Sequence, residues 1–393
     1  MYNKVYLKHG KEESLLRFHP WIFSGAIHHI DHGINEGDVV DVMAADGRFI
    51  ATGHYQGGSI AVRVLSFSQT AVDDAFWAAR LKSALQMRTA LGLAADPSGQ
   101  TTAYRLVHGE GDMLPGLIID IYGRTAVMQA HSIGMHRSRH AIAEALVQAM
   151  EGTLDNVYYK SETTLSFVEP ESGFIIGGGE ADNIATENGL RFYVDWLKGQ
   201  KTGFFVDQRE NRRLLESYAR NRRVLNMFCY TGGFSFYAMR GGATLVHSVD
   251  SSAKAIELTR RNVELNFPDD PRHKAFCEDA FHYLEQEATP YDLIILDPPA
   301  FAKHRGALHN ALKGYTRLNN KAFEKIAPGG ILFTFSCSQV VTKDNFRNAV
   351  FTAAAQAHRQ VRILHQLHQP ADHPINIYHP EGEYLKGLVL YVE

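Results

Sequence analysis

Residues 224–252 read VLNMFCYTGGFSFYAMRGGATLVHSVDSS, and this stretch decides the fold class. An apolar strand turns on Gly232 and Gly233, an apolar helix follows, and a second strand ends on Asp250. Glycine lets the backbone turn sharply and approach a ligand closely. Ligands of parallel α/β sheets bind beyond the carboxyl ends of the strands. The stretch therefore predicts both the sheet and the end at which its site lies.

The same alternation continues to the C-terminus and predicts a parallel, doubly wound sheet, an α/β fold of the Rossmann-like kind. The expected strands are residues 223–228, 243–250, 274–279, 291–297, 329–337, 362–368 and 385–392. The expected helices are residues 234–241, 251–265, 280–287, 319–327 and 345–357.

The chain has 393 residues, more than one core usually organises, so several domains are expected. Residues 1–70 alternate in short strands with one short helix and predict a small β-rich domain. Residues 71–190 mix helices with strands and predict a middle α/β domain. Residues 191–393 then form the domain with the parallel sheet.

Composition excludes several classes of protein. Hydrophobic residues make up 45% and charged residues 21% of the chain, with a net charge of -3, so a mainly disordered chain is excluded. The N-terminus lacks the apolar core of a signal peptide, and no run is long enough to span a membrane. We expect a cytoplasmic protein without membrane contact.

Metal and disulfide chemistry are not indicated. The cysteines (Cys229, Cys277 and Cys337) are odd in number and form no CxxC pair. The C-terminal histidines stand in a proline-containing segment without regular spacing, so no metal site is expected.

Carboxylates end two further strands. Asp250 lies about twenty residues past the glycine turn, where a carboxylate can bind ribose hydroxyls. The alternative is an N-cap of the following helix. Asp279 ends the third strand and could reach an adenine amine. A GxGxxG pattern is missing, so a dinucleotide site is weakly supported.

The fourth strand ends in LDPPAF, residues 296–301. Two prolines remove two amide donors and fix the loop, and the preceding Asp297 is held extended. A rigid loop with a carboxylate suits a planar base placed against it. The alternative is a turn that only ends the strand.

Together, the glycine turn, the two acids and the DPP loop resemble class I S-adenosylmethionine-dependent methyltransferases. Further stretches, among them HPWIFSGAI, KTGFFVDQRENRR, FTFSCS and PEGEYLKG, resemble the bacterial large-subunit (23S) ribosomal RNA cytosine-5 methyltransferases from end to end. The resemblance implies an N-terminal PUA domain, a middle domain and a methyltransferase domain. It also implies S-adenosylmethionine as cofactor, ribosomal RNA as partner, and a homodimer as one option. The implied cofactor-binding residues are Gln208, Phe228, Tyr230, Thr231, Gly232, Gly233, Asp250, Ser251, Asp279 and Ala280.

The resemblance assigns catalysis to Cys337 and Asp297. C5 of cytosine is a poor nucleophile, and a thiolate that adds at C6 makes C5 an enamine carbon able to take a methyl group. A carboxylate that bonds N3 and N4 stabilises the charge on the ring. The alternative for Cys337 is a packed thiol at a strand end. We expect Cys229 to pack beside the cofactor and Cys277 to lie in the core.

RNA contacts are expected from the DPP loop and two basic stretches, residues 201–223 and 303–325. The candidate substrate-binding residues are Pro298, Pro299, Phe301, Lys303 and Arg317. The basic stretches also fit ordinary solvated helix faces. The N-terminal domain is not strongly basic, so its RNA binding is implied by resemblance alone.

Two other functions stay open. One is methylation of an exocyclic amine or ring nitrogen, for example on guanine, with Cys337 structural. The other is a non-catalytic RNA-binding assembly factor that keeps the cofactor fold.

Overall fold

The computed structural model describes residues 2–94, 98–161, 164–165, 172–178, 183–286 and 289–393. The chain divides into two compact units. The first comprises Met1–Gly189, Val194–Val206 and Ala371–Gly382. The second comprises Leu190–Tyr193, Asp207–Pro370 and Glu383–Glu393.

The first unit begins with a six-stranded sheet of order β2-β6-β5-β4-β1-β3. Its elements are β1 (Asn3–Leu7), α1 (Glu13–Leu16), β2 (Trp21–Phe23), η1 (Ser24–Ala26), β3 (Ile27–Ile30), β4 (Val39–Met43), β5 (Phe49–Tyr55) and β6 (Ile60–Ser66). A turn at Asp46 and Gly47 joins β4 to the antiparallel β5. Alternating apolar residues such as Val40 and Val42 are fully buried and form the core of this domain.

A second, five-stranded sheet of order β11-β10-β9-β8-β7 follows in the same unit. The elements of this domain are α2 (Asp74–Ala90), β7 (Ala103–His108), η2 (Gly109–Asp112), β8 (Leu117–Tyr122), β9 (Thr125–Ala130), α3 (Ile133–Arg137), α4 (Arg139–Ala149), β10 (Asn156–Lys160) and β11 (Ser172–Ile176). Strand β12 (Ile184–Glu187) follows and lies outside this sheet. Asp73 caps α2 by accepting a hydrogen bond from the Phe76 amide (3.0 Å). The helix packs with α4 over an apolar core.

The segment Ala371–Gly382 returns to this first unit late in the chain and includes η5 (Pro380–Gly382). Arg88 is fully buried, and its Nη2 donates to the carbonyl of Asp372 (2.7 Å). The Asp372 carboxylate accepts from the backbone amide of Arg105 (3.0 Å). These bonds satisfy buried polar groups and fix the segment on the middle domain.

The second unit is a seven-stranded sheet of order β16-β15-β14-β17-β18-β20-β19. The strands of this sheet are β14 (Arg223–Met227), β15 (Leu245–Asp250), β16 (His273–Cys277), β17 (Tyr291–Leu296), β18 (Ile326–Ser336), β19 (Val361–Leu367) and β20 (Lys386–Val392). Strand β13 (Leu190–Tyr193) belongs to the same unit but lies outside this sheet. The helices are η3 (Val206–Gln208), α5 (Arg209–Tyr218), α6 (Gly233–Arg240), α7 (Ala253–Asn266), α8 (Ala280–Gln286), η4 (Arg305–Ala307), α9 (Leu308–Lys325) and α10 (Lys343–Gln356).

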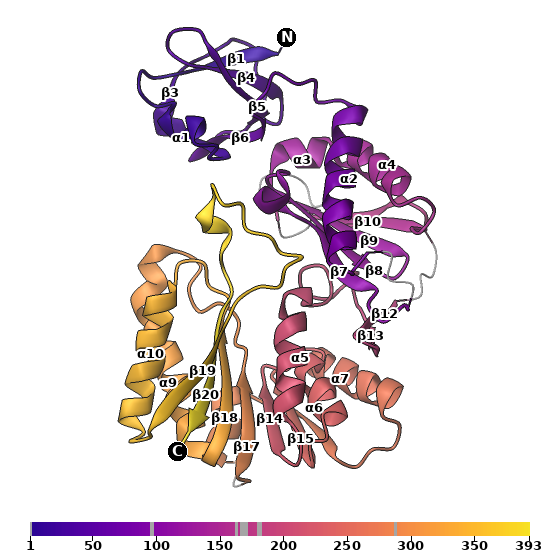
Figure 1. The fold of residues 1–393 in the computed structure, drawn as a ribbon, viewed down its shortest axis with the longest axis vertical. Helices are drawn as coiled ribbons and strands as arrows, with labels where there is room; N and C mark the ends of the chain where they lie inside the picture. The colour runs from indigo at the N-terminus through magenta and orange to yellow at the C-terminus, as the bar shows by residue number, and fades with distance from the viewer. Residues whose placement is uncertain (1, 95–97, 162–163, 166–171, 179–182, 287–288) are drawn as a thin grey trace. The chain divides into compact units, whose positions relative to one another are not determined.

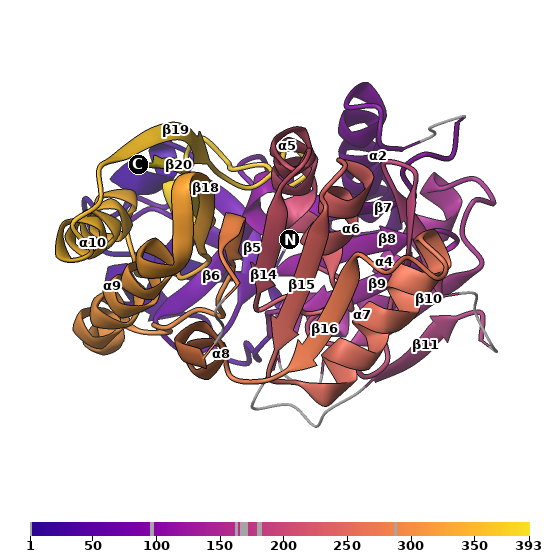
Figure 2. The same cartoon turned by 90° about the horizontal axis from the view of Figure 1, so that it is seen from below.

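Helices cover both faces of this sheet. Helices α5, α6 and α7 lie on one side, and α9 and α10 lie on the other, with α8 against α9 (Figure 1). The central strands β14 and β17 are therefore buried on both faces and read as continuous apolar runs. The view in Figure 2 shows β14, β15 and β16 running side by side.

The sheet departs from the prediction in two places. The strands from β14 to β18 are parallel as predicted, but β20 pairs antiparallel with both β18 and β19. The connection from β19 to β20 contains only the short η5 and no crossover helix, so β20 runs back antiparallel between its neighbours. Helix α9 also begins at Leu308, well before the predicted residue 319, because its first turns bury Ala311 and Tyr315.

Among the described residues, we find no helix with the length and apolar character needed to cross a membrane.

Candidate active site

The glycine turn between β14 and α6 has an unusual backbone. Phe228 and Tyr230 have positive φ values of 57° and 48°, and Gly232 has 85°. A Cβ added at Gly232 would lie 2.6 Å from Cζ of Phe236, so only glycine fits here. Strained non-glycine residues cluster at functional sites, and this turn lies at the carboxyl end of the central strand.

Asp250 fastens this turn to the end of β15. One carboxylate oxygen accepts the Tyr230 amide (3.0 Å) and the other accepts the Ser252 amide (2.9 Å). The N-cap of α7 is Ser252, whose hydroxyl accepts from the Ala255 amide (3.3 Å), so the alternative that made Asp250 the helix cap is wrong. Each carboxylate oxygen can accept a further bond, which leaves capacity for two ribose hydroxyls.

Asp279 begins α8 at the end of the next strand. Its Oδ1 accepts the amides of Phe281 (2.9 Å) and His282 (3.1 Å), as a helix cap does. Cys277 lies just before it and is exposed, so the prediction of a core cysteine is wrong. The reason is that β16 is the edge strand of the sheet, where alternate side chains stay in solvent.

Asp297 follows β17 and is held by the start of α5. The Gln208 amide nitrogen donates to Oδ2 of Asp297 (3.0 Å), and Gln208 itself accepts from Asn211 (2.6 Å). Although part of the Asp297 surface stays accessible, protein surrounds the carboxyl group, and this loss of solvation raises its pKa to about 7. The negative charge of Asp207 raises this pKa further, while Gln208 and Arg212 oppose the rise.

Cys337 follows the last residue of β18 and is half-buried. Its neighbours are fixed, because Ser336 donates to the Tyr315 hydroxyl (2.9 Å) and Ser338 donates to the carbonyl of Ala302 (2.5 Å). Burial raises the pKa of Tyr315 to about 12, and the charges of Cys337 and Asp297 both act in the same direction. Tyr315 therefore lies within electrostatic range of both predicted catalytic groups, which come from the neighbouring strands β17 and β18.

Two residues next to this site, Lys386 and Tyr384, could not be recognised from the sequence pattern. Lys386 begins β20 and donates to the carbonyl of Ser338 (2.6 Å). The Tyr384 hydroxyl donates to Asp207 (2.7 Å). Both belong to the quoted stretch PEGEYLKG, which was used only for resemblance. Nothing in its pattern shows that an antiparallel strand returns it to β18.

The structure brings the predicted cofactor residues to the carboxyl ends of β14, β15 and β16, with Gln208 instead bonded to Asp297. Phe228, Tyr230, Thr231, Gly232 and Gly233 form the turn, Asp250 and Ser251 follow β15, and Asp279 and Ala280 start α8. Their binding roles stay predictions.

The substrate residues are more dispersed. Pro298 is buried, Pro299 is exposed, and the ring of Phe301 packs on Tyr315 with centroids 4.6 Å apart. Lys303 is exposed, and the Arg317 guanidinium lies over the ring of Phe281 (4.6 Å).

The first basic stretch is structural in part, whereas its residues Lys201, Arg213 and Arg220 are exposed. Arg209 and Arg212 are buried, and Arg223 pairs with Asp292 (3.2 Å). These side chains are therefore poorly placed for phosphate contacts.

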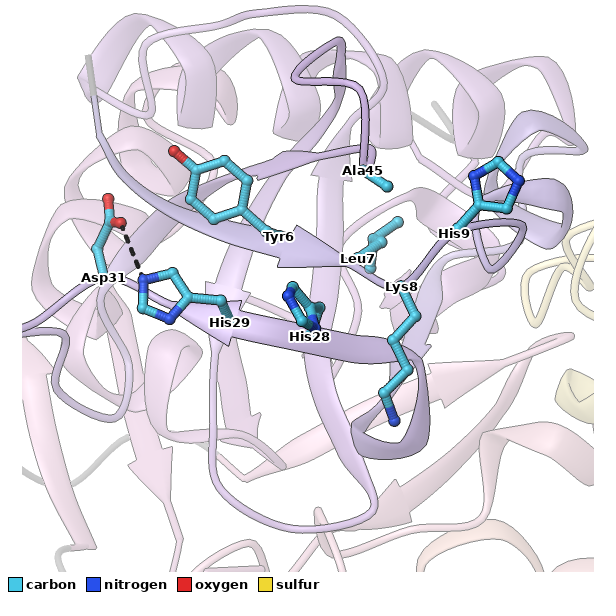
Figure 3. A pocket seen from close by; sticks show the side chains of 8 residues that line it. All are labelled: Tyr6, Leu7, Lys8, His9, His28, His29, Asp31 and Ala45. Atoms are coloured by element: carbon cyan, nitrogen blue, oxygen red, sulfur yellow. Dashed lines mark ion pairs between the residues drawn. The ribbon is translucent and has the colours of Figure 1, made fainter.

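A second candidate surface is a pocket of about 610 Å³ on the N-terminal sheet (Figure 3). The rings of Tyr6 and His29 stack with centroids 5.9 Å apart, and Nζ of Lys8 donates to the carbonyl of Gly25 (2.9 Å). The pocket is lined by Tyr6, Leu7, Lys8, His9, His28, His29, Asp31 and Ala45. Tyr6 is half-buried and His29 is exposed. Aromatic rings beside a cation can stack a nucleobase and hold its phosphate.

The C-terminal histidines form one notable contact. His379 lies with His19 and Glu381, and each imidazole Nε2 is 3.7 Å from Oε2 of Glu381. A tetrahedral zinc ion with ligands about 2.0–2.1 Å away needs ligand atoms about 3.3 Å apart. Burial lowers the pKa of His379, which disfavours a charged imidazole and an ion pair here, and the absence of metal stays a prediction.

Two family models match the chain. A model for S-adenosylmethionine-dependent methyltransferases matches residues 166–380, and a model for PUA-like domains matches residues 5–67. The first covers more than half of the chain.

Several known proteins are similar over their full length. Ribosomal RNA large subunit methyltransferase I of Tolumonas auensis is 40% identical over 400 residues, covering 99% of both chains. The protein of that name from Salmonella typhi is 38% identical, covering 100% of this chain and 98% of its own. Among solved structures, a Streptococcus mutans chain provisionally described as a SAM-dependent methyltransferase has a TM-score of 0.84 at 24% identity, covering 99% of both chains.

Proposed function

Because the chain belongs to the ribosomal RNA large subunit methyltransferase I family of S-adenosylmethionine-dependent methyltransferases, we propose that it methylates C5 of a cytosine in 23S ribosomal RNA. The observation that carries the proposal is the placement of Cys337 and Asp297 at the carboxyl ends of the adjacent parallel strands β18 and β17. A thiol and a carboxyl group at one sheet end are the two groups that this reaction needs.

The cofactor supplies an electrophilic methyl group. The turn from Phe228 to Gly233 offers backbone at close approach, and Asp250 is the residue for the ribose. Ser251, Asp279 and Ala280 border the place proposed for the adenine, and Gln208 lies at the side of Asp297. Uncharged backbone suits a cationic sulfonium better than a phosphate-cradling loop would.

The reaction begins when the Cys337 thiolate adds to C6 of the cytosine and the C5–C6 π electrons shift toward C5. C5 then forms a bond to the methyl carbon, and the pair of the broken carbon–sulfur bond stays on the cofactor sulfur. Loss of the C5 proton to a base restores the C5–C6 double bond and expels the thiolate from C6. The net products are 5-methylcytosine, S-adenosylhomocysteine and one proton.

Asp297 is the group for the N3 and N4 edge of the base. With a pKa of about 7, a large fraction of its carboxyl groups carries a proton at neutral pH. The protonated form can donate to N3 while its second oxygen accepts from the N4 amine. That bond strengthens as the ring gains negative charge, so it favours the transition state over the ground state.

RNA would be positioned by more than one domain. Pro298, Pro299 and Phe301 form the rigid loop for the target base, and Lys303 and Arg317 are the candidate phosphate contacts. The stacked rings of Tyr6 and His29 offer a second contact on the PUA-like domain. We propose that the chain consists of a PUA-like domain (residues 1–70), a middle α/β domain (residues 71–190) and a methyltransferase domain (residues 191–393).

The test uses ribosomal RNA that contains 5-fluorocytosine. Fluorine cannot leave as a proton does, so the C6-linked intermediate should accumulate with S-adenosylmethionine present. We expect a denaturation-resistant protein–RNA band for the wild type and for Cys277→Ser, and none for Cys337→Ala. Methyl transfer to ordinary RNA without any band would overturn C5 chemistry and favour methylation of an amine or ring nitrogen.

A further inference from the structure

We propose that Lys386 is the positioning residue that holds Cys337 as a thiolate ready for attack. The inference rests on the proposed function, since it assigns a partner to the nucleophile of that reaction. It concerns a residue of β20, the strand that runs antiparallel to its neighbours.

Strand pairing places Lys386 at the site. Lys386 pairs with Ser336 in the β18–β20 register, so its backbone lies one residue from Cys337 along the strand direction. The side chain is only 5% exposed, and Nζ donates to the carbonyl of Ser338 (2.6 Å). The ammonium group is thus anchored on the residue that follows the nucleophile.

Cys337 is the strongest source of negative charge acting on Lys386. Burial lowers the pKa of Lys386 to about 8, and the charge of Cys337 is the largest influence that opposes this fall. Glu383 also opposes it, but Glu383 is ion-paired with Lys343 (2.5 Å), whose charge lowers the pKa. A buried ammonium without a counterion is costly, so lysine and cysteine are each stabilised in the charged form by the other.

The pair also fits the chemistry at both ends of the reaction. The thiolate is the reactive form, and its attack on C6 consumes the charge that faces Lys386. When the C5–C6 double bond reforms, the expelled sulfur regains that charge beside the ammonium group. A fixed cation therefore favours formation of the attacking thiolate and departure of the same group after methyl transfer.

The experiment measures thiol reactivity without RNA or cofactor. The full chain is treated with iodoacetamide at several pH values, and alkylation of each cysteine is followed by mass spectrometry of its peptide. Cys277 is exposed and serves as the reference thiol in the same tube. Lys386→Met removes charge and donor, whereas Lys386→Gln removes the charge but keeps a donor for the Ser338 carbonyl.

We expect both Lys386 variants to lower the alkylation rate of Cys337 at pH 7 about tenfold, which corresponds to a thiol pKa about one unit higher. Lys343→Met removes an exposed charge of the same sign and should change the rate less than about twofold. The Cys277 rate should be unchanged in every variant. Thermal melting curves check that the variants are folded.

Unchanged Cys337 reactivity in folded Lys386→Gln would overturn the inference and leave Lys386 with a structural hydrogen bond only. A lower alkylation rate of Cys337 in Lys386→Met but not in Lys386→Gln would also overturn the inference. The hydrogen-bond donor, and not the charge, would then be what matters. The proposed function fails differently, through the absence of a wild-type adduct with 5-fluorocytosine RNA. A shifted alkylation profile without that adduct would support the pairing and overturn the proposed reaction.

Discussion

Cys229 and Cys337 each follow a parallel strand of the same sheet, at the same end, yet their surroundings differ. Cys229 is 6% exposed, and burial raises its pKa far above the usual range, with the charge of Asp250 acting in the same direction. Cys337 is half-buried and lies within electrostatic range of the Lys386 ammonium group. Both thiols occupy the same kind of position in the sheet. A difference in their reactivity must therefore come from local solvation and from the sign of the nearest charge.

The difference follows from the strands that flank each thiol. Cys229 lies in the glycine turn between β14 and α6, where its amide donates to Val249 (3.0 Å) and its sulfur contacts the Thr259 hydroxyl (3.9 Å). Cys337 lies beside β20, which introduces a cation. The prediction that Cys229 packs is confirmed by its burial.

The largest effect should separate these two thiols directly. Cys337→Ala should lower methyl transfer on the order of a thousandfold or more, because the nucleophile is lost. Cys229→Ala should keep the methyl-transfer rate within a few-fold and instead reduce the free energy of unfolding by roughly 1 kcal/mol, since it opens a small cavity. Single-turnover transfer and urea denaturation measure the two quantities. Loss of methyl transfer in Cys229→Ala but not in Cys337→Ala would identify Cys229 as the nucleophile instead.

Asp297→Asn should follow, with transfer lowered roughly 10²-fold to 10³-fold because an amide N–H can donate a hydrogen bond to N3 but cannot transfer a proton to it. The same substitution should increase the stability of the folded protein, although it lowers the activity. The folded-state pKa of about 7 lies above the ordinary 3.8, so the folded protein holds an extra proton between these values and loses stability as pH rises through them. Thermal melting should show a larger gain for the variant over wild type at pH 8 than at pH 5. Equal gains at both values would contradict the burial argument.

Asp250→Asn should have the smallest effect of these substitutions. It tests the comparison of the two thiols through Cys229, whose pKa is raised in part by the charge of Asp250. Loss of the carboxylate should weaken S-adenosylmethionine binding about tenfold, through the ribose hydroxyls and the loosened Tyr230 amide. It should also leave Cys229 unreactive toward iodoacetamide, because burial is the first cause of its raised pKa. Isothermal titration and peptide mass spectrometry test both halves. Rapid alkylation of Cys229 in the variant would show that charge outweighs burial there.

Much of the fold could be predicted because its signals are local. The apolar runs of β14 and β17 and the turn at Gly232 are consequences of neighbouring residues. The direction of β20 could not be predicted in this way, because strand pairing joins residues as distant as Ser336 and Lys386. Cys277 was misplaced for the same reason, since the edge position of β16 depends on strand order.

The sequence by itself determined the family, the cofactor class and the candidate groups Cys337 and Asp297, because these follow from motifs of contiguous residues. The tertiary structure alone decided the protonation chemistry of Asp297 and the surroundings of Cys337. Burial and Asp207 raise the pKa of Asp297, and the return of β20 places Lys386 near Cys337. Solvation and charge act through space over a few ångströms, and only folding sets those distances.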